Sequence, residues 1–168
     1  FAIRGNTINS NGAYLSLGNN KTTANTTSDD NLGLITFNDS DSDAGEYARI
    51  VGASDGANGT NDYPGKLLFS TTADGGSSPT ERMRINSSGK VGIGCAPVRD
   101  FQLHTSDSSS ELMLSNSTTG ATAGSGFMIQ QDGNDNYIWN KENSFMSFGT
   151  NALERMRIDS SGNIGIGT

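Results

Sequence analysis

The sequence lacks most of the residues on which catalytic, metal and disulfide sites depend. It contains one cysteine, Cys95, and one histidine, His104, in 168 residues. A single cysteine cannot form an intrachain disulfide, and one Cys with one His is too few ligands for a zinc site. A Cys–His nucleophilic pair also needs an orienting third group and a pocket, which nothing in the sequence indicates. We therefore expect no enzyme activity and no cofactor.

Basic residues and long apolar runs are also scarce. The chain has 11 Lys and Arg against 18 Asp and Glu, a formal net charge of −7. Binding to nucleic acid or to an anionic membrane surface relies on Lys and Arg. No apolar run approaches the roughly 18 residues of a membrane span. We expect no nucleic-acid partner and no membrane insertion.

Large apolar side chains are few: hydrophobic residues make up 32% of the chain and aromatic residues 7%. Ordering the backbone costs about 1–2 kcal/mol per residue, which so thin a core can hardly offset within one chain. Either part of the chain is disordered, or other copies of the chain complete the core. The modest net charge favours the second alternative.

A fourteen-residue motif occurs twice, at 81–94 (ERMRINSSGKVGIG) and at 154–167 (ERMRIDSSGNIGIG). A weaker match aligns 66–70 with 144–148. The repeat predicts two modules joined by a linker at 95–100. The first module is 1–94, with an insertion near 19–31, and the second is 101–168.

Both modules are predicted to consist of short strands. Gly, Asn, Asp and Ser clusters bound the segments 14–17, 33–38, 47–52, 66–71 and 137–140, as strands with tight turns require. Residues 151–154 could begin a helix, but Met156 and Ile158 alternate with arginines, which favours a strand. Asp159 to Gly162 then form a tight turn with Gly162 at positive φ. The predicted fold class is all-β, with repeated short-strand modules.

After each turn, glycines alternate with aliphatic residues. Glycine weakens an isolated strand, so this pattern indicates a close approach of backbones at Gly92, Gly94, Gly165 and Gly167. The apolar residues of the two motif copies are predicted to form the core between chains. They are Met83, Ile85, Val91, Ile93, Met156, Ile158, Ile164 and Ile166.

The motif at 154–168 resembles one found in tail-fibre and tail-spike proteins of bacteriophages. In that family a Pro-containing linker and a strand often follow, and Gly94 to Pro97 leading to Leu103 and His104 fits, with Cys95 where Thr is usual. The resemblance implies an intertwined homotrimeric β-fibre, similar to a triple β-helix or β-prism. It also implies a virion tail appendage, outside the cell, with other fibre or tail proteins as partners. Many relatives carry a self-cleaving intramolecular chaperone after such modules, and nothing in 1–168 resembles that domain.

The leading hypothesis is therefore a shaft segment of a trimeric phage tail fibre that also binds host receptors. One alternative is a non-viral extracellular filament or adhesin built from the same repeats. Another is a polysaccharide depolymerase, because spacing along the sequence does not reveal the separation of two carboxylates across a cleft.

Receptor binding is expected where the two modules differ, at 19–30, 54–63 and 124–141. Tyr137 and Trp139 alternate on one strand face near Asn134, and an exposed aromatic ring beside polar groups suits a host-surface glycan. Burial of Trp139 in a core is the alternative.

Two further clusters carry hypotheses. Asp39, Asp41 and Asp43 alternate in one loop and could bind Ca²⁺, although Gly45 and Ile50 depart from the EF-hand pattern; a solvated acidic loop is the alternative. Arg82, Arg84, Arg155 and Arg157 are expected to pair with acidic groups of a neighbouring chain, such as Glu81 or Glu154.

Overall fold

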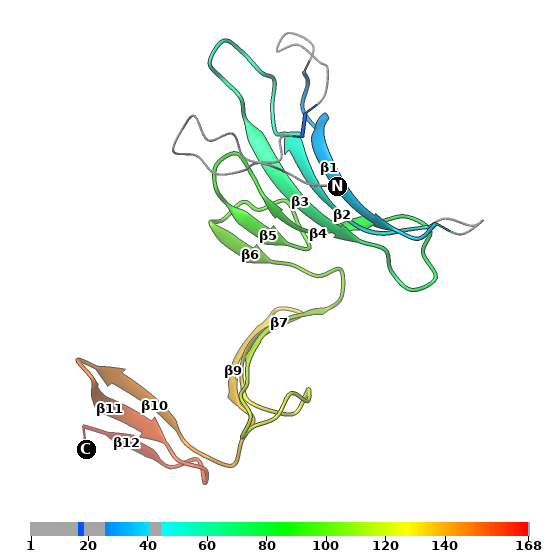
Figure 1. The fold of residues 1–168 in the computed structure, drawn as a ribbon. Coiled ribbons are helices and arrows are strands. Elements are labelled where there is room, and N and C mark those ends of the chain that lie inside the picture. Colours follow the sequence, from blue (N-terminus) through cyan, green and yellow to red (C-terminus); the bar gives the residue numbers. More distant parts are fainter. Residues whose placement is uncertain (1–16, 19–25, 41–44, 168) are drawn as a thin grey trace, which may run out of the picture. The chain divides into compact units, whose positions relative to one another are not determined.

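The computed structural model describes residues 17–18, 26–40 and 45–167. These residues form twelve strands and no helix, so the all-β prediction is confirmed. The chain folds as two units, Phe1–His104 and Thr105–Thr168 (Figure 1).

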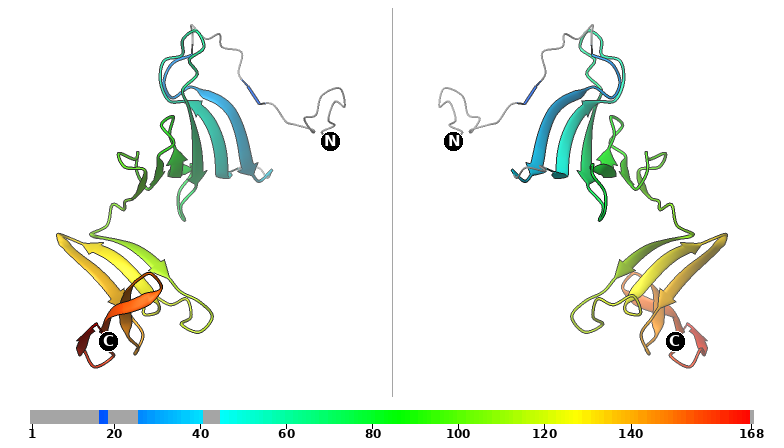
Figure 2. Two further views of the ribbon diagram at one scale, coloured as in Figure 1. Left: turned by 90° about the vertical axis from the view of Figure 1, so that its left-hand side faces the viewer. Right: turned by 90° about the vertical axis from the view of Figure 1, so that its right-hand side faces the viewer.

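The first unit is one six-stranded sheet whose strands follow chain order (Figure 2). Its strands are β1 (Asn31–Asn38), β2 (Glu46–Ser54), β3 (Gly65–Thr71), β4 (Thr80–Ile85), β5 (Val91–Ile93) and β6 (Phe101–Leu103). All neighbours pair antiparallel except β5 and β6, which run parallel. The start of the predicted second module, at 101, therefore pairs with the first sheet.

The second unit contains two three-stranded antiparallel sheets. One consists of β7 (Ser109–Leu114), β8 (Phe127–Asp132) and β9 (Asp135–Asn140). The other consists of β10 (Met146–Thr150), β11 (Leu153–Ile158) and β12 (Ile164–Ile166).

The repeated motif folds the same way twice, as strand, turn and strand. Asn86 and Asp159 begin the two turns, and Gly89 (φ 75°) and Gly162 (φ 85°) hold the left-handed position. Each glycine N–H donates to the carbonyl oxygen of the first turn residue, at 2.9 and 3.0 Å. The strands predicted at 33–38, 47–52, 66–71 and 137–140 and in the motif are confirmed, as is this turn. The strand predicted at 14–17 lies outside the described residues except for Leu17.

The strand before each motif is repeated as well. The strand pairing aligns its two copies one residue away from the sequence match of 66–70 with 144–148. Leu67 lies opposite Ile85, and Met146 lies opposite Ile158, so Leu67 corresponds to Met146. The pairing shifts register after Phe69 in one copy and after Phe148 in the other. This repeated bulge sets the register, which side-chain similarity alone did not give.

Few apolar side chains are buried in the described part of a single chain. Val51, Ala53 and Met128 form the buried apolar core, whereas 21 large apolar side chains are exposed. A sheet with one uncovered apolar face is incomplete as a folded layer.

Candidate functional site

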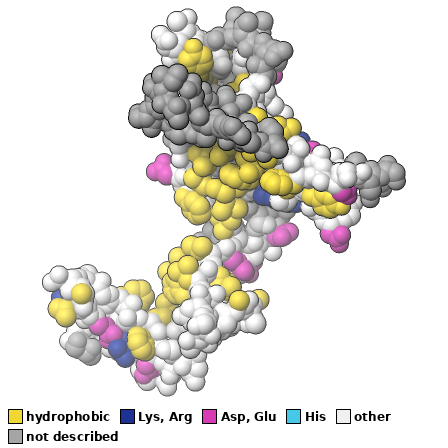
Figure 3. Space-filling model, viewed as in Figure 1, with side chains coloured by type: hydrophobic (Ala, Val, Ile, Leu, Met, Phe, Trp, Pro, Cys, Tyr) yellow, Lys and Arg dark blue, Asp and Glu magenta, His cyan; other side chains and the backbone are white. Residues whose placement is uncertain are grey.

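One face of the first sheet is a continuous apolar surface. Residues directly opposite one another in adjacent strands share a face. One such row crosses all six strands, and it consists of Ile35, Ile50, Phe69, Met83, Ile93 and Leu103. A second row contains Leu67, Ile85, Val91 and Phe101. Hydrophobic side chains gather over this unit in Figure 3.

The opposite face of the same sheet carries charge. Leu68 lies opposite Arg84, which lies opposite Gly92. Arg84 is held by Glu81 through Nε and Nη2, at 2.5 and 2.6 Å. Val51, which lies opposite Leu68 on the same face, is only 3% exposed. The two faces of the sheet therefore differ: one combines charged Arg84 with apolar Leu68 and Val51, and the other presents apolar side chains.

The β10–β12 sheet repeats this arrangement in the second unit. Two apolar rows cross it, Met146–Ile158–Ile164 and Phe148–Met156–Ile166. The intervening row is Ser147, Arg157 and Gly165, so the polar groups lie on the other face.

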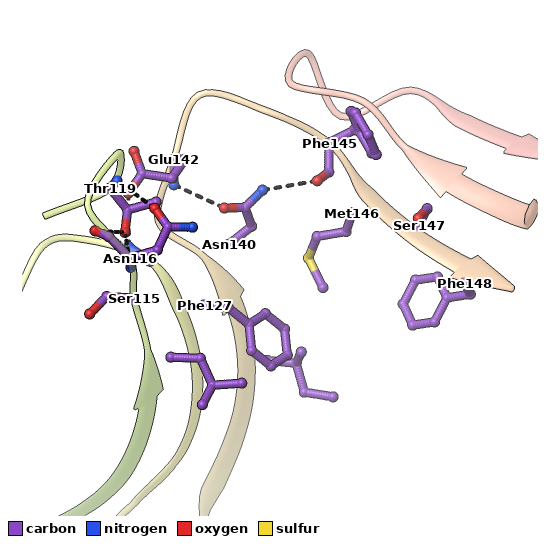
Figure 4. A pocket seen from close by; sticks show the side chains of 13 residues that line it. Ser115, Asn116, Thr119, Phe127, Asn140, Glu142, Phe145, Met146, Ser147 and Phe148 are labelled. Carbon is purple, nitrogen blue, oxygen red and sulfur yellow. Dashed lines mark hydrogen bonds between the residues drawn. The ribbon is translucent and has the colours of Figure 1, made fainter.

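The β7–β9 sheet has an apolar row as well, Leu112, Ile129 and Ile138, and all three side chains are exposed. A pocket of about 540 Å³ lies within this unit, and its lining includes Leu114, Phe127, Ile138, Met146 and Phe148. Figure 4 shows Phe127, Met146 and Phe148 around it. Ile138 of the apolar row and two residues of the apolar face of β10 therefore line the same pocket.

The polar side of this pocket is fixed by hydrogen bonds. The Asn140 amide donates to the carbonyl oxygen of Phe145 at 2.9 Å, and its oxygen accepts from the Glu142 N–H at 3.1 Å (Figure 4). The Glu142 carboxylate accepts from the Gly126 N–H at 2.8 Å. The loop between β9 and β10 is thus tied to the β7–β9 sheet.

All eight residues predicted for the core between chains lie on these apolar faces. Met83, Ile85, Val91, Met156 and Ile158 are half-buried, whereas Ile93, Ile164 and Ile166 are exposed. The exposed fractions of Ile164 and Ile166 reach 62% and 78%. Their common face could be predicted from the sequence because the alternation of side chains along a strand alone determines which face each residue occupies.

Two of the predicted glycine positions are crowded by the same chain. A Cβ on Gly92 would collide with the carbonyl of Cys95 and with Pro97, and one on Gly94 would collide with the carbonyl of His104. Gly167 has φ +71° but open space around it. The close approach at 92 and 94 is therefore made within one chain, by the linker and by His104 directly after β6.

The motif arginines also find partners within the chain. Arg157 binds Glu154 through Nε and Nη2, both at 2.8 Å, as Arg84 binds Glu81. Arg82 and Arg155 each donate from Nε to a threonine hydroxyl, Thr71 or Thr150, at 3.0 Å. Arg84 and Arg157 therefore form ion pairs with acidic groups of their own strand, whereas Arg82 and Arg155 bind threonines.

Tyr137 and Trp139 stack on β9, with ring centroids 5.2 Å apart and an interplanar angle of 15°. The Lys141 ammonium lies 4.8 Å from the Trp139 ring centroid. Trp139 therefore contacts both the Tyr137 ring and the Lys141 ammonium. Trp139 is 40% exposed and donates from Nε1 to the side-chain oxygen of Gln130 at 3.2 Å.

The same strand face carries a polar network. The Gln130 amide donates to the Ser109 hydroxyl at 2.9 Å and to the Glu111 carboxylate at 3.0 Å. Asn134 lies in the turn between β8 and β9 and is exposed. The structure thus brings Tyr137 and Trp139 together and leaves Asn134 at the hairpin tip.

Sequence reasoning missed a charged cluster in the first unit. The Lys66 side chain is 4% exposed and forms ion pairs with Asp29 and, at 3.4 Å, with Asp55. The backbone N–H and hydroxyl of Ser87 donate to Asp55 at 2.9 and 2.7 Å and hold the pKa of Asp55 below its usual value. The hydrogen bond from Lys66 lowers the pKa of Asp29. A lysine at the start of a strand gave no signal that it would be buried.

Of the predicted calcium ligands, Asp41 and Asp43 lie outside the described residues. Asp39 accepts hydrogen bonds from the Tyr47 hydroxyl at 2.6 Å and from the Gly45 N–H at 2.7 Å. These bonds lower the pKa of Asp39, and the first of them raises the pKa of Tyr47. Asp39 therefore closes the base of this loop.

Within the described ranges, no group of three His, Cys, Asp or Glu side chains could hold a metal ion. Over the same residues, no helix is long and apolar enough to cross a bilayer.

No protein-family model matches the chain, and no curated protein matches it. A solved structure that does match is the carboxy-terminal domain of the bacteriophage T5 L-shaped tail fibre with its intra-molecular chaperone domain. The similarity covers 100% of this chain, with a TM-score of 0.55 and 13% sequence identity. The chain spans 62% of that structure's length. At this identity the likeness concerns the fold, and it places the chain's all-β architecture beside that of a phage tail-fibre domain.

Proposed function

We propose that this protein is a structural segment of a homotrimeric phage tail fibre, located in a virion tail appendage outside the cell, with other fibre or tail proteins as partners. The observation that carries the proposal is the uncovered apolar surface of the sheets. Among the described residues of each unit, no layer is packed on rows such as Phe69–Met83–Ile93 and Phe148–Met156–Ile166, whose side chains stay half-buried or exposed. Copies of the same chain supply that layer.

The energetics favour association of copies. Burial of apolar surface yields about 25 cal/mol per Å², or 1.5–3 kcal/mol for each fully buried Leu, Ile or Phe. Several such side chains per sheet remain exposed in the described chain, among them Ile35, Leu67 and Ile166. Obligate oligomers commonly bury apolar surfaces of this kind. The phage motif and the tail-fibre fold support three copies and a fibre.

The oligomeric state can be measured by light scattering coupled to gel filtration. We expect a particle of about three times 17.6 kDa at micromolar concentration. Ile93→Asp places a charge on the apolar face and should yield monomers or aggregates. Gln102→Glu is the matched control, because Gln102 lies on the other face of the neighbouring strand, and it should remain trimeric. A folded monomer for the parent chain would refute the proposal.

A fibre of a virus and a cellular filament would share this packing. Antibodies against the chain, used in immunogold electron microscopy of phage particles from the same source, distinguish them. We expect labelling of tail appendages, and labelling of cell-surface filaments would instead establish the adhesin.

Receptor binding is a second role that a specific observation favours, namely the Tyr137–Trp139 stack with its polar surroundings. Lys141 covers one Trp139 face through an exposed cation–π contact, worth only about 0.5–1 kcal/mol. A sugar ring can displace this side chain, stack on Trp139 and accept a hydrogen bond from the lysine. Glu111 and Gln130 supply further groups for hydroxyls. Trimerisation would present the site three times, and avidity can strengthen weak contacts by 10² or more.

Adsorption to host cells tests this second role. Trp139→Ala should reduce adsorption severalfold while the protein stays trimeric. Trp139→Phe, which keeps an aromatic ring but loses the donor to Gln130, should retain most of it. Unchanged adsorption of trimeric Trp139→Ala would place receptor binding elsewhere and would leave the fibre proposal untouched.

A further inference from the structure

The two copies of the motif differ at one edge. In the first unit β5 lies between β4 and β6, whereas β12, its counterpart, pairs only with β11 among the described strands (Figure 1). The pairing of β12 with β11 has the same register as that of β5 with β4, so Ile164 corresponds to Val91 and Ile166 to Ile93.

In the first unit, β6 completes this edge. The Val91 N–H donates to the carbonyl of Asp100 at 2.8 Å, and the His104 N–H donates to the carbonyl of Ile93 at 2.9 Å. Phe101 lies opposite Val91 and Leu103 opposite Ile93, so β6 also extends the apolar face. Ile93 is 36% exposed, whereas its counterpart Ile166 is 78% exposed.

The backbone that leads out of β12 already has the conformation found after β5. Gly94 and Gly167 each donate from N–H to a carbonyl of the preceding strand, that of Arg82 or Arg155, at 2.8 and 2.9 Å. Their φ angles are 75° and 71°. At Gly94 the carbonyl of His104 fills the position of a Cβ, but at Gly167 that position is open.

We propose that the edge of β12 is the docking site for a parallel strand that corresponds to β6. The occupant is an extended segment with large apolar side chains at its first and third positions and a polar residue between them, the pattern of Phe101, Gln102 and Leu103. Its backbone bonds to the Ile164 N–H and the Ile166 carbonyl. Its two apolar side chains extend the row at Ile164 and the row at Ile166.

The occupant is joined to β12 by a short loop. A three-residue strand makes few hydrogen bonds and two apolar contacts, too little to offset the translational and rotational freedom that a separate chain loses on binding. In the first unit a short loop with Pro97 packed against Gly92 removes most of that cost. This inference is independent of the fibre proposal, because it needs neither three copies nor a phage.

The test adds the sequence Ala-Pro-Val-Arg-Asp-Phe-Gln-Leu-His-Thr, copied from 96–105, directly after Thr168 of the full chain. Amide hydrogen exchange is measured by NMR with and without the extension. We expect exchange of the Ile164 amide to slow by at least about tenfold in the extended chain. The control extension has serine in place of its Phe and Leu, and it should leave exchange unchanged. Equal exchange with both extensions would overturn the proposal.

Gly167→Ala supplies a second measurement. In the extended chain its Cβ should meet the carbonyl of the added histidine and abolish the protection of Ile164, whereas the unextended chain should keep its exchange rate. The free ten-residue peptide at millimolar concentration should not protect Ile164. Protection of Ile164 by the free peptide would contradict the proposal that the occupant is joined to β12 by a short loop. Concentration-dependent protection of Ile164 in the unextended chain would show that a second copy takes the edge.

Discussion

Arg84 donates two parallel hydrogen bonds to Glu81 across the bulge of β4, at 2.5 and 2.6 Å. Arg157 and Glu154 repeat this pair in the second unit at 2.8 Å. The hydrogen bonds raise the pKa of Arg84 and lower the pKa of Glu154. The motif therefore contains its own ion pair, three residues apart, within a bulged strand.

Arg84→Lys tests the value of the bidentate geometry, because lysine keeps the charge but cannot donate two parallel bonds. We expect a loss of about 1 kcal/mol or less in the free energy of unfolding, since partly exposed ion pairs contribute little. Arg157→Lys should lower the unfolding midpoint less, because the Arg157 side chain is 45% exposed and that of Arg84 is 23% exposed. Calorimetry of both variants measures the difference, and the reverse order would contradict this explanation.

The first residue of the motif turn acts as an acceptor. Asn86 Oδ1 accepts from the N–H groups of Ser88 and Lys90, and Asp159 Oδ1 accepts from those of Ser161 and Asn163. Asn86→Asp keeps this acceptor and should be nearly neutral. Asn86→Ala removes it and should cost about 1 kcal/mol. Urea unfolding compares the two, and equal stabilities would show that the side-chain bonds do not stabilise the turn.

The local features of the fold could be predicted from the sequence, and the non-local ones could not. The alternation around Met156 and the glycine of the turn depend on neighbouring residues, so strand and turn followed from the motif alone. The pairing of Phe101 with Val91 depends on a parallel crossover, which no local pattern encodes. The site shows the same division: Tyr137 and Trp139 share a strand face by periodicity, but the Lys66 cluster joins residues far apart in sequence.

Acid should destabilise the first unit through Asp55. Its pKa is lowered in the folded state by the bonds from Ser87 and by Lys66, so the unfolded chain takes up a proton first as pH falls. The stabilisation is present above the unfolded pKa of about 4 and is lost as pH falls through the lower folded value. Asp55→Asn should flatten the dependence of the unfolding midpoint on pH in this range. Parallel pH profiles for the parent and Asp55→Asn would contradict it.

The last prediction separates backbone strain from crowding at the motif glycines. Gly89 and Gly94 have the same φ angle, +75°, so an alanine at either position carries the same conformational cost of roughly 1–2 kcal/mol. A Cβ at Gly89 meets open space, whereas one at Gly94 would collide with the backbone carbonyl of His104. Gly94→Ala should therefore cost more than Gly89→Ala by a further 1–3 kcal/mol or so, because β6 must move away from β5. Calorimetric midpoints of the two variants measure the difference, and exchange of the Val91 amide should rise only in Gly94→Ala. Equal midpoints would mean that β6 shifts at no cost, and the close approach of the His104 carbonyl would then not explain the glycine at 94.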